Sequence, residues 1–150
     1  MPFPRSSSSR SGLRAAAPGT ISKKGVGMQE FTFYLGNRPG ALLEVASALA
    51  EEKVNIEAIA ALTVLDEAVV AMVTDAPDKT RKVLKKLGVD YEEREALAMS
   101  LPHQPGQLAT ILDRLARDGI NVLSCYFSTE KNQIIFTVDD LARAKAIFRL

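Results

Sequence analysis

Few residues of this 150-residue chain have side chains suited to catalysis. It contains one histidine, His103, and one cysteine, Cys125. A single imidazole and a single thiol cannot complete a zinc site or a disulfide framework. The chain also has no glycine-rich phosphate loop and no serine, histidine and aspartate in triad order. The sequence therefore predicts no metal or other cofactor and no enzymatic activity, with Cys125 as a small core or interface residue. The low cysteine content is typical of a cytoplasmic protein.

Two short polar segments have a spacing that suits ligand binding. They are Asn37-Arg38-Pro39-Gly40 and His103-Gln104-Pro105-Gly106, and each precedes an amphipathic stretch. Free N–H groups at a helix N-terminus favour an anion such as a carboxylate, and an asparagine side chain offers both a donor and an acceptor. A second asparagine, Asn55 or Asn121, follows each amphipathic stretch. These two sets are the candidate binding residues.

Each of these residues also has a purely structural interpretation. Gly40 either leaves room for a ligand or only lets the turn close, since glycine costs about 1 kcal/mol relative to alanine within a helix. Asn37 either contacts a ligand or caps a helix, and His103 either contacts a ligand or is a solvated loop or capping residue. Asn55 either belongs to an edge or interface or merely begins a strand. The residue types alone leave these alternatives open.

Hydrophobic periodicity defines the elements that would position the turns. Residues 31–35 alternate as a half-buried strand, and residues 42–49 follow helical spacing, with Pro39 suited to the first helical turn. Strands are expected over 54–63 and 68–74, a helix over 75–87 that ends at Gly88, and a fourth strand over about 89–94. This order is that of a ferredoxin-like α+β sandwich.

The same residue types recur at the same spacing 66 positions later. Pro39-Gly40 matches Pro105-Gly106, Asn55 matches Asn121, and the core positions of the first strand and helix also recur. Past the second hairpin the offset falls to 64, as a turn shorter by two residues would produce. The sequence therefore predicts an α+β protein of two ferredoxin-like βαββαβ modules in tandem, spanning 28–94 and 95–150. Because Leu150 falls within the last predicted helix, the second module is expected to lack its last strand.

Residues 1–27 differ from the rest in composition. They hold a serine run, several prolines and glycines, and no acidic residue. We expect a disordered extension, while a transit peptide or translation starting at Met28 are alternatives. The remaining chain carries 14 basic and 18 acidic residues, which argues against a nucleic-acid surface. No apolar run approaches the roughly 20 residues of a membrane span.

The two turns and the repeat together resemble the ACT domain. The segments that carry the resemblance are residues 37–42 with Val54-Asn55-Ile56, and residues 103–108 with Ile120-Asn121-Val122. The resemblance covers about residues 30–150, and over this range the chain is similar to small stand-alone amino-acid-binding ACT proteins. In that family the ligand lies between modules, contacted by the turn of one and the start of strand 2 of another. The implied contacts are Asn37, Gly40, Ala41, Leu42, Asn55, Ile56, His103, Gly106, Gln107, Leu108, Asn121 and Val122, and Arg38 in the first turn is added to them.

The turns also depart from one pattern within that family. Some serine-binding ACT domains have a histidine two positions before the asparagine, where this chain has Leu35 and Leu101. Serine is therefore not indicated, and the side-chain preference is not readable. His103 replaces Asn37 in the second copy, so only that site contains an imidazole, and the two sites should differ in affinity or pH response.

The resemblance implies a regulatory, ligand-sensing protein that binds an amino acid, forms a homodimer and acts allosterically, with a biosynthetic enzyme as a further partner. The alternative is a regulatory or interaction subunit with no small ligand of its own. A third reading is an acylphosphatase-like enzyme, because that fold uses an arginine after strand 1 with an asparagine nearby, as Arg38 and Asn55 would imitate. The matching position in the second copy is Gln104, which argues against it.

Overall fold

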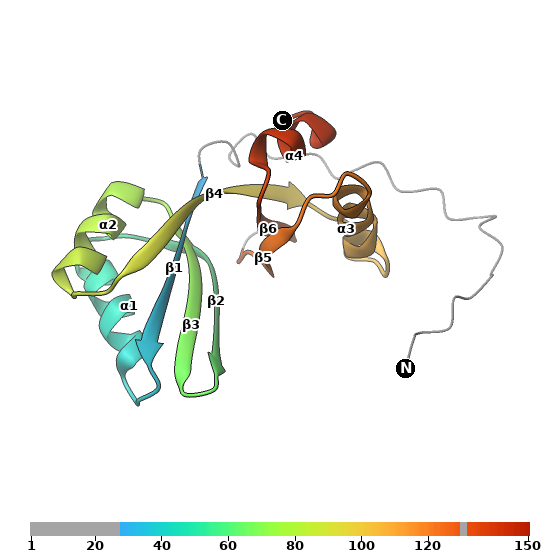
Figure 1. The fold of residues 1–150 in the computed structure, drawn as a ribbon. Coiled ribbons are helices and arrows are strands. Elements are labelled where there is room, and N and C mark those ends of the chain that lie inside the picture. Colours follow the sequence, from blue (N-terminus) through green and yellow to red (C-terminus); the bar gives the residue numbers. More distant parts are fainter. Residues whose placement is uncertain (1–27, 130–131) are drawn as a thin grey trace.

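The computed structural model describes residues 28–129 and 132–150 (Figure 1). The expectations for residues 1–27 lie outside the described part of the chain. Ten elements follow in order: β1 (Met28–Gly36), α1 (Ala41–Glu51), β2 (Ile56–Val64), β3 (Glu67–Thr74), α2 (Pro77–Lys86), β4 (Tyr91–Ser100), α3 (Gln107–Arg117), β5 (Val122–Phe127), β6 (Gln133–Val138) and α4 (Leu141–Phe148). None of the described helices is long and apolar enough to span a membrane.

The first module is an antiparallel sheet covered by two helices. Its strands lie in the order β2-β3-β1-β4, and α1 and α2 lie together on one face (Figure 1). Alternation along β1 turns Phe31 and Phe33 toward the helices, where they are buried against Val45 and Leu49 of α1. The predicted ferredoxin-like arrangement is confirmed.

The fourth strand is longer than predicted. The sequence predicted a strand ending near Arg94 and a new one around Leu97, whereas β4 runs without a break from Tyr91 to Ser100. Residues 91–96 pair with β1, and residues 97–100 pair with β6. No glycine or proline occurs in β4 to end the strand. The predicted boundary between residues 94 and 95 therefore falls inside one strand that serves both modules.

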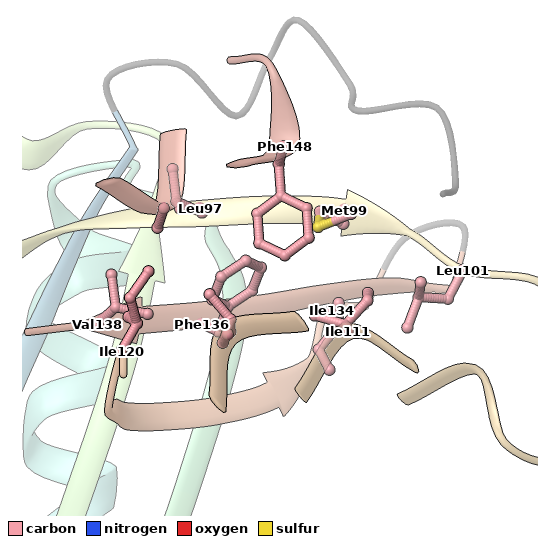
Figure 2. Packing of buried hydrophobic residues seen from close by; sticks show 11 residues of the cluster. Leu97, Met99, Leu101, Ile111, Ile120, Ile134, Phe136, Val138 and Phe148 are labelled. Carbon is pink, nitrogen blue, oxygen red and sulfur yellow. The ribbon is translucent and has the colours of Figure 1, made fainter. Parts of the chain in front are cut away.

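The second module repeats the arrangement with strands β4-β6-β5 and helices α3 and α4. Figure 2 shows Phe148 reaching from α4 toward Met99 and Phe136, and the two phenyl rings lie edge to face with centroids 6.0 Å apart. No strand follows α4 among the described residues, as expected for this module.

Several element boundaries differ from the predicted ones by about two residues. Helix α1 begins at Ala41 and not at Pro39, and α2 spans Pro77–Lys86 where residues 75–87 were predicted. Strand β2 begins at Ile56 and not at Val54, because the Val54 N–H donates to the carbonyl of Leu49 and thereby closes the end of α1. Val45 and Leu49 of α1 and Val83 and Leu84 of α2 are buried as predicted. Leu42 and Leu87, which the periodicity also placed inward, lie at the helix ends and are each 39% exposed.

The two modules meet through the sheet faces that the helices leave bare. Five buried residues form this apolar contact, with Met28 and Tyr126 packed against them: Ala58, Val73, Ala96, Ala98 and Ile135. Beyond β5, the N–H and the hydroxyl of Thr129 both donate to the carbonyl of Glu57 at the start of β2, at 3.2 and 2.9 Å. The inter-module contact thus joins the bare faces and the edge strands.

A buried carboxylate lies in this contact. Glu30 of β1 is only 1% exposed, and its Oε2 accepts hydrogen bonds from the Ser124 hydroxyl at 2.5 Å and the Tyr126 hydroxyl at 2.9 Å. Thr137 shares a further hydroxyl contact with Ser124 at 2.7 Å. Burial, followed by the Glu30 carboxylate, raises the pKa of Tyr126. Hydrogen bonds between β1 and β5 therefore tie the modules together.

The internal repeat shows that this polar cluster is present in only one half of the contact. Under the 66- and 64-residue offsets, Glu30 corresponds to Ala96, Ser124 to Ala58, and Thr137 to Val73. Those counterparts are buried and apolar. The two repeat-related parts of the inter-module contact therefore share a backbone arrangement, but one part is held by side-chain hydrogen bonds and the other by apolar packing.

Candidate functional site

The Pro-Gly segments form type II β-turns that lead into α1 and α3. The Ala41 N–H donates to the Arg38 carbonyl at 3.3 Å, and Gly40 has φ 85° and ψ −7°. The second turn repeats this with a bond from the Gln107 N–H to the Gln104 carbonyl at 3.4 Å and with φ 89° at Gly106. Such a turn takes proline at its second position and needs a positive φ at its third. This explains the Pro-Gly pair in both copies.

The structure gives one reason for glycine at both positions. A Cβ built at Gly40 or Gly106 would meet no atom within 4 Å, so close packing inside the chain does not demand glycine there. The positive φ does. The space in front of each turn is open toward solvent.

The capping interpretations of Asn37 and His103 are wrong. The N-cap residues are Gly40 and Gly106, and neither helix start receives a side-chain cap. Asn37 and His103 instead lie at the centre of tight three-residue turns, since the N–H of Arg38 donates to the Gly36 carbonyl at 2.9 Å and that of Gln104 to the Pro102 carbonyl at 2.8 Å. Both side chains are exposed, and that of Asn37 has no hydrogen bond to any described residue.

The first turn of each helix presents unpaired donors. The N–H groups of Leu42 and Leu43 in α1, and those of Leu108 and Ala109 in α3, have no acceptor among the described residues. Uncapped N–H groups at a helix start carry partial positive charge and favour an anion. The two turns therefore present corresponding pairs of N–H donors without an acceptor among the described residues.

Arg38 distinguishes the first turn from the second. Its guanidinium donates two hydrogen bonds to Glu44, at 3.0 and 2.9 Å, and this pairing raises the pKa of Arg38 and lowers that of the Glu44 carboxyl. The second copy has Gln104 and Thr110 at these positions. Glu44 was not predicted from the sequence, although its six-residue spacing from Arg38 across a turn was the available signal.

Asn55 and Asn121 are held by their main chains. Asp75 accepts a hydrogen bond from the Asn55 N–H at 2.9 Å and returns its own N–H to the Asn55 carbonyl at 3.0 Å. Asp139 does the same for Asn121, at 2.9 and 3.1 Å. Both asparagines precede their strands directly, which is the strand-start interpretation, and are exposed. Asp75 and Asp139 were not predicted from the sequence, although they recur at the 64-residue offset.

The structure does not bring the turn and the strand start of one module together. In module 1, β1 ends opposite Glu67 and β2 begins opposite Thr74, at the two ends of β3. Seven residues of strand separate these levels by about 23 Å. Arg38 and Asn55 therefore lie at opposite ends of the sheet, which rules out the acylphosphatase-like pairing.

The predicted site residues are thus distributed over separate places. The turn containing Asn37, Arg38, Gly40, Ala41 and Leu42 lies at the end of β1 that points away from module 2 (Figure 1). Asn55 and Ile56 lie at the other end, next to the Glu57 carbonyl that Thr129 of module 2 contacts. In module 2, His103, Gly106, Gln107 and Leu108 form the turn after β4, and Asn121 and Val122 begin β5.

The sequence predicted Cys125 to be a core or interface residue, and the structure excludes the core position. It lies on the edge strand β5 and is exposed. Partial desolvation raises the pKa of its thiol, so it has no feature of an activated nucleophile.

Comparison with known proteins connects these features to a family. The sequence model of a family described as an ACT domain pair matches residues 26–150. A search of curated proteins returned no match.

Solved structures share the fold at low sequence identity. Protein BT0572 from Bacteroides thetaiotaomicron is 24% identical with a TM-score of 0.72, over 81% of this chain and 85% of that one. The regulatory subunit of aspartate kinase from Thermus thermophilus is 18% identical with a TM-score of 0.62, over 81% and 87%. The corresponding subunit from Thermus flavus is 18% identical with a TM-score of 0.59, over 81% and 88%.

Proposed function

The chain belongs to the ACT domain pair family, and on this premise we propose that it is a cytoplasmic regulatory protein that binds an amino acid and has no catalytic activity of its own. One observation carries the proposal: each module presents an open Pro-Gly turn, and the N–H groups of the second and third helical residues after it have no acceptor among the described residues. An amino acid brings a carboxylate, which accepts hydrogen bonds from such donors.

The first turn supplies complementary groups for both ends of an amino acid. The N–H groups of Leu42 and Leu43 receive the carboxylate, and the side-chain oxygen of Asn37 accepts from the ammonium group. Arg38 is already paired with Glu44, so its role is to keep the turn in place. The first turn is therefore the stronger of two unequal sites, because the second has His103 in place of Asn37 and lacks the ion pair.

A second copy of the chain completes the first site in this proposal. The first turn lies about 23 Å from the start of β2 in its own module, and it points away from module 2. A strand start such as Asn55-Ile56 or Asn121-Val122 reaches it only from another molecule. We therefore propose a homodimer, in which ligand binding changes how the two copies fit and so produces an allosteric output.

A docking subunit without its own ligand is the second candidate. Its support is the shared fold with chains described as regulatory subunits of aspartate kinase, although identities of 18% bear on the fold only. In this alternative, the modules bind a biosynthetic enzyme directly.

A thermal-shift screen of the twenty amino acids tests the proposal. A ligand at a hundredfold excess over its Kd stabilises the native state by about 2.7 kcal/mol, which raises the melting temperature of a chain of this size by roughly 5–10 °C. The shift should shrink for Asn37→Ala and remain for Ser47→Ala, a control on the exposed side of α1. The amide derivative of the active amino acid, which lacks the carboxylate, should give no shift. A flat screen would instead favour the docking subunit.

A further inference from the structure

The bare face of the module 1 sheet carries an exposed apolar row. The register places Leu62 of β2 opposite Val69 of β3, and Val69 opposite Tyr34 of β1. Residues directly opposite in an antiparallel sheet share a face, so these three side chains form what we call the distal row. Leu62 is 57% exposed and Tyr34 is 62% exposed. The distal row is not covered by any described part of the chain.

The distal row is continuous with the contact between the modules. On the same face, the next row contains Ala60 and Ala71, both partly buried, and the row beyond contains Ala58 and Val73 of the inter-module cluster. The molecule therefore already packs one end of this surface against another bare sheet face.

Module 2 shows that the fold does not require an apolar distal row. Under the repeat offsets, Tyr34, Leu62 and Val69 correspond to Ser100, Ser128 and Gln133. These residues occupy the same places, since Ser100 lies opposite Gln133 and the Ser128 N–H donates to the Gln133 carbonyl at 2.8 Å. A surface role specific to module 1 accounts for this difference.

The neighbouring sheet edge is also unprotected. Strand β2 is an outer strand of the sheet, and from Ala58 to Val64 it has no charged residue and no proline. Edge strands that remain exposed usually carry such residues to prevent association. Exposed apolar side chains beside an unguarded edge mark a protein-binding surface.

We propose that a second copy of this chain docks on the distal row. The distal row contains no charged side chain, so identical molecules approach it without electrostatic repulsion. It lies at the same end of β1 as the Asn37 turn, away from module 2 (Figure 1), where the ligand site proposed above needs a second copy. The choice of a second copy as the binding partner rests on that proposed function. The surface itself is defined independently, by the exposure of its side chains and by the strand register.

Sedimentation equilibrium of the full chain tests this surface. The wild type should sediment at twice the 16.3 kDa mass of one chain. The triple variant Tyr34→Ser, Leu62→Ser, Val69→Gln, which installs the residues found in module 2, should keep its circular dichroism and raise the dimer dissociation constant at least about thirtyfold. The matched control is Phe127→Ser, which removes a side chain that is 56% exposed on the edge strand of module 2 and should leave the dimer intact.

The inference is overturned by a monomeric wild type, or by a folded triple variant that dimerises as tightly as the wild type. It is equally overturned if Phe127→Ser dissociates the dimer and the triple variant does not. These readouts need no ligand. If no amino acid raised the melting temperature while the triple variant still weakened the dimer, the proposed function would be contradicted and the docking surface would remain supported.

Discussion

Replacing Glu30 tests how the two modules are held together. The Glu30→Ala variant removes the acceptor that β1 offers to the Ser124 and Tyr126 hydroxyls of β5. Because Glu30 is 1% exposed, water does not readily take its place. A hydrogen bond to a charged group contributes about 1.5–3 kcal/mol, and a buried donor left without an acceptor costs about 1–3 kcal/mol. Ser124 keeps its contact with Thr137, so we expect a net loss of about 3 kcal/mol in the free energy of unfolding.

A double-mutant cycle separates the hydrogen bond from loss of packing. Glu30→Ala, Tyr126→Phe and the double variant are unfolded in urea, and the coupling energy is the departure of the double variant from additivity. We expect a coupling of about 1.5 kcal/mol, because the Tyr126 hydroxyl lies 2.9 Å from the carboxylate.

Glu92→Ala is the matched control for this cycle. Glu92 is an exposed glutamate of β4 that is ion-paired with Arg94, so its removal should change stability by less than about 0.5 kcal/mol. A coupling energy between Glu30 and Tyr126 indistinguishable from zero, or equal destabilisation by Glu30→Ala and Glu92→Ala, would refute the reasoning.

Three further predictions concern the turns, the strand starts and pH. Gly40→Ala should lower the free energy of unfolding by about 1 kcal/mol because φ is +85° there, and Gly40→Asn should cost less because asparagine tolerates this conformation; equal losses in urea unfolding would contradict the strain argument. Asp75→Ala should cost about 1–2 kcal/mol by leaving the Asn55 N–H without its acceptor, and the cost should largely disappear for the exposed neighbour Asp78→Ala. The pKa of Tyr126 is raised by folding, so the folded state keeps this proton after the unfolded state has lost it; stability should therefore fall above about pH 10 by up to about 1.4 kcal/mol per pH unit, and Tyr126→Phe should lack that part of the loss in alkaline unfolding curves.

The sequence predicted the elements well where burial follows a regular period. Phe31 and Phe33 alternate and Val45 and Leu49 follow helical spacing, and all four are buried as predicted. The continuous β4 was missed because Glu93 and Glu95 resemble the end of a strand. In the structure they pair with Arg81 of α2 and Lys145 of α4, and a strand accommodates charges that such partners neutralise.

The positions of the two candidate turns were predictable from the sequence, and the arrangement of the other candidate residues around them was not. Pro-Gly before an amphipathic stretch located both turns, but the positive φ of Gly40 and the tight turn at Asn37 depend on backbone geometry. The separation of the Asn37 turn from Asn55 follows from strand register, which no short motif encodes. The Glu30 and Ser124 contact joins residues 94 positions apart, and no local pattern indicated it.

Amide chemical shifts test the central claim most directly. In a ¹⁵N-labelled sample titrated with the amino acid that stabilises the protein most, the amides of Leu42 and Leu43 should show the largest saturable shifts, because they are the donors proposed for the carboxylate. Smaller shifts are predicted at Leu108 and Ala109 in the second turn. A saturable titration that leaves both pairs of amides unmoved, or no saturable titration with any of the twenty amino acids, would contradict the account.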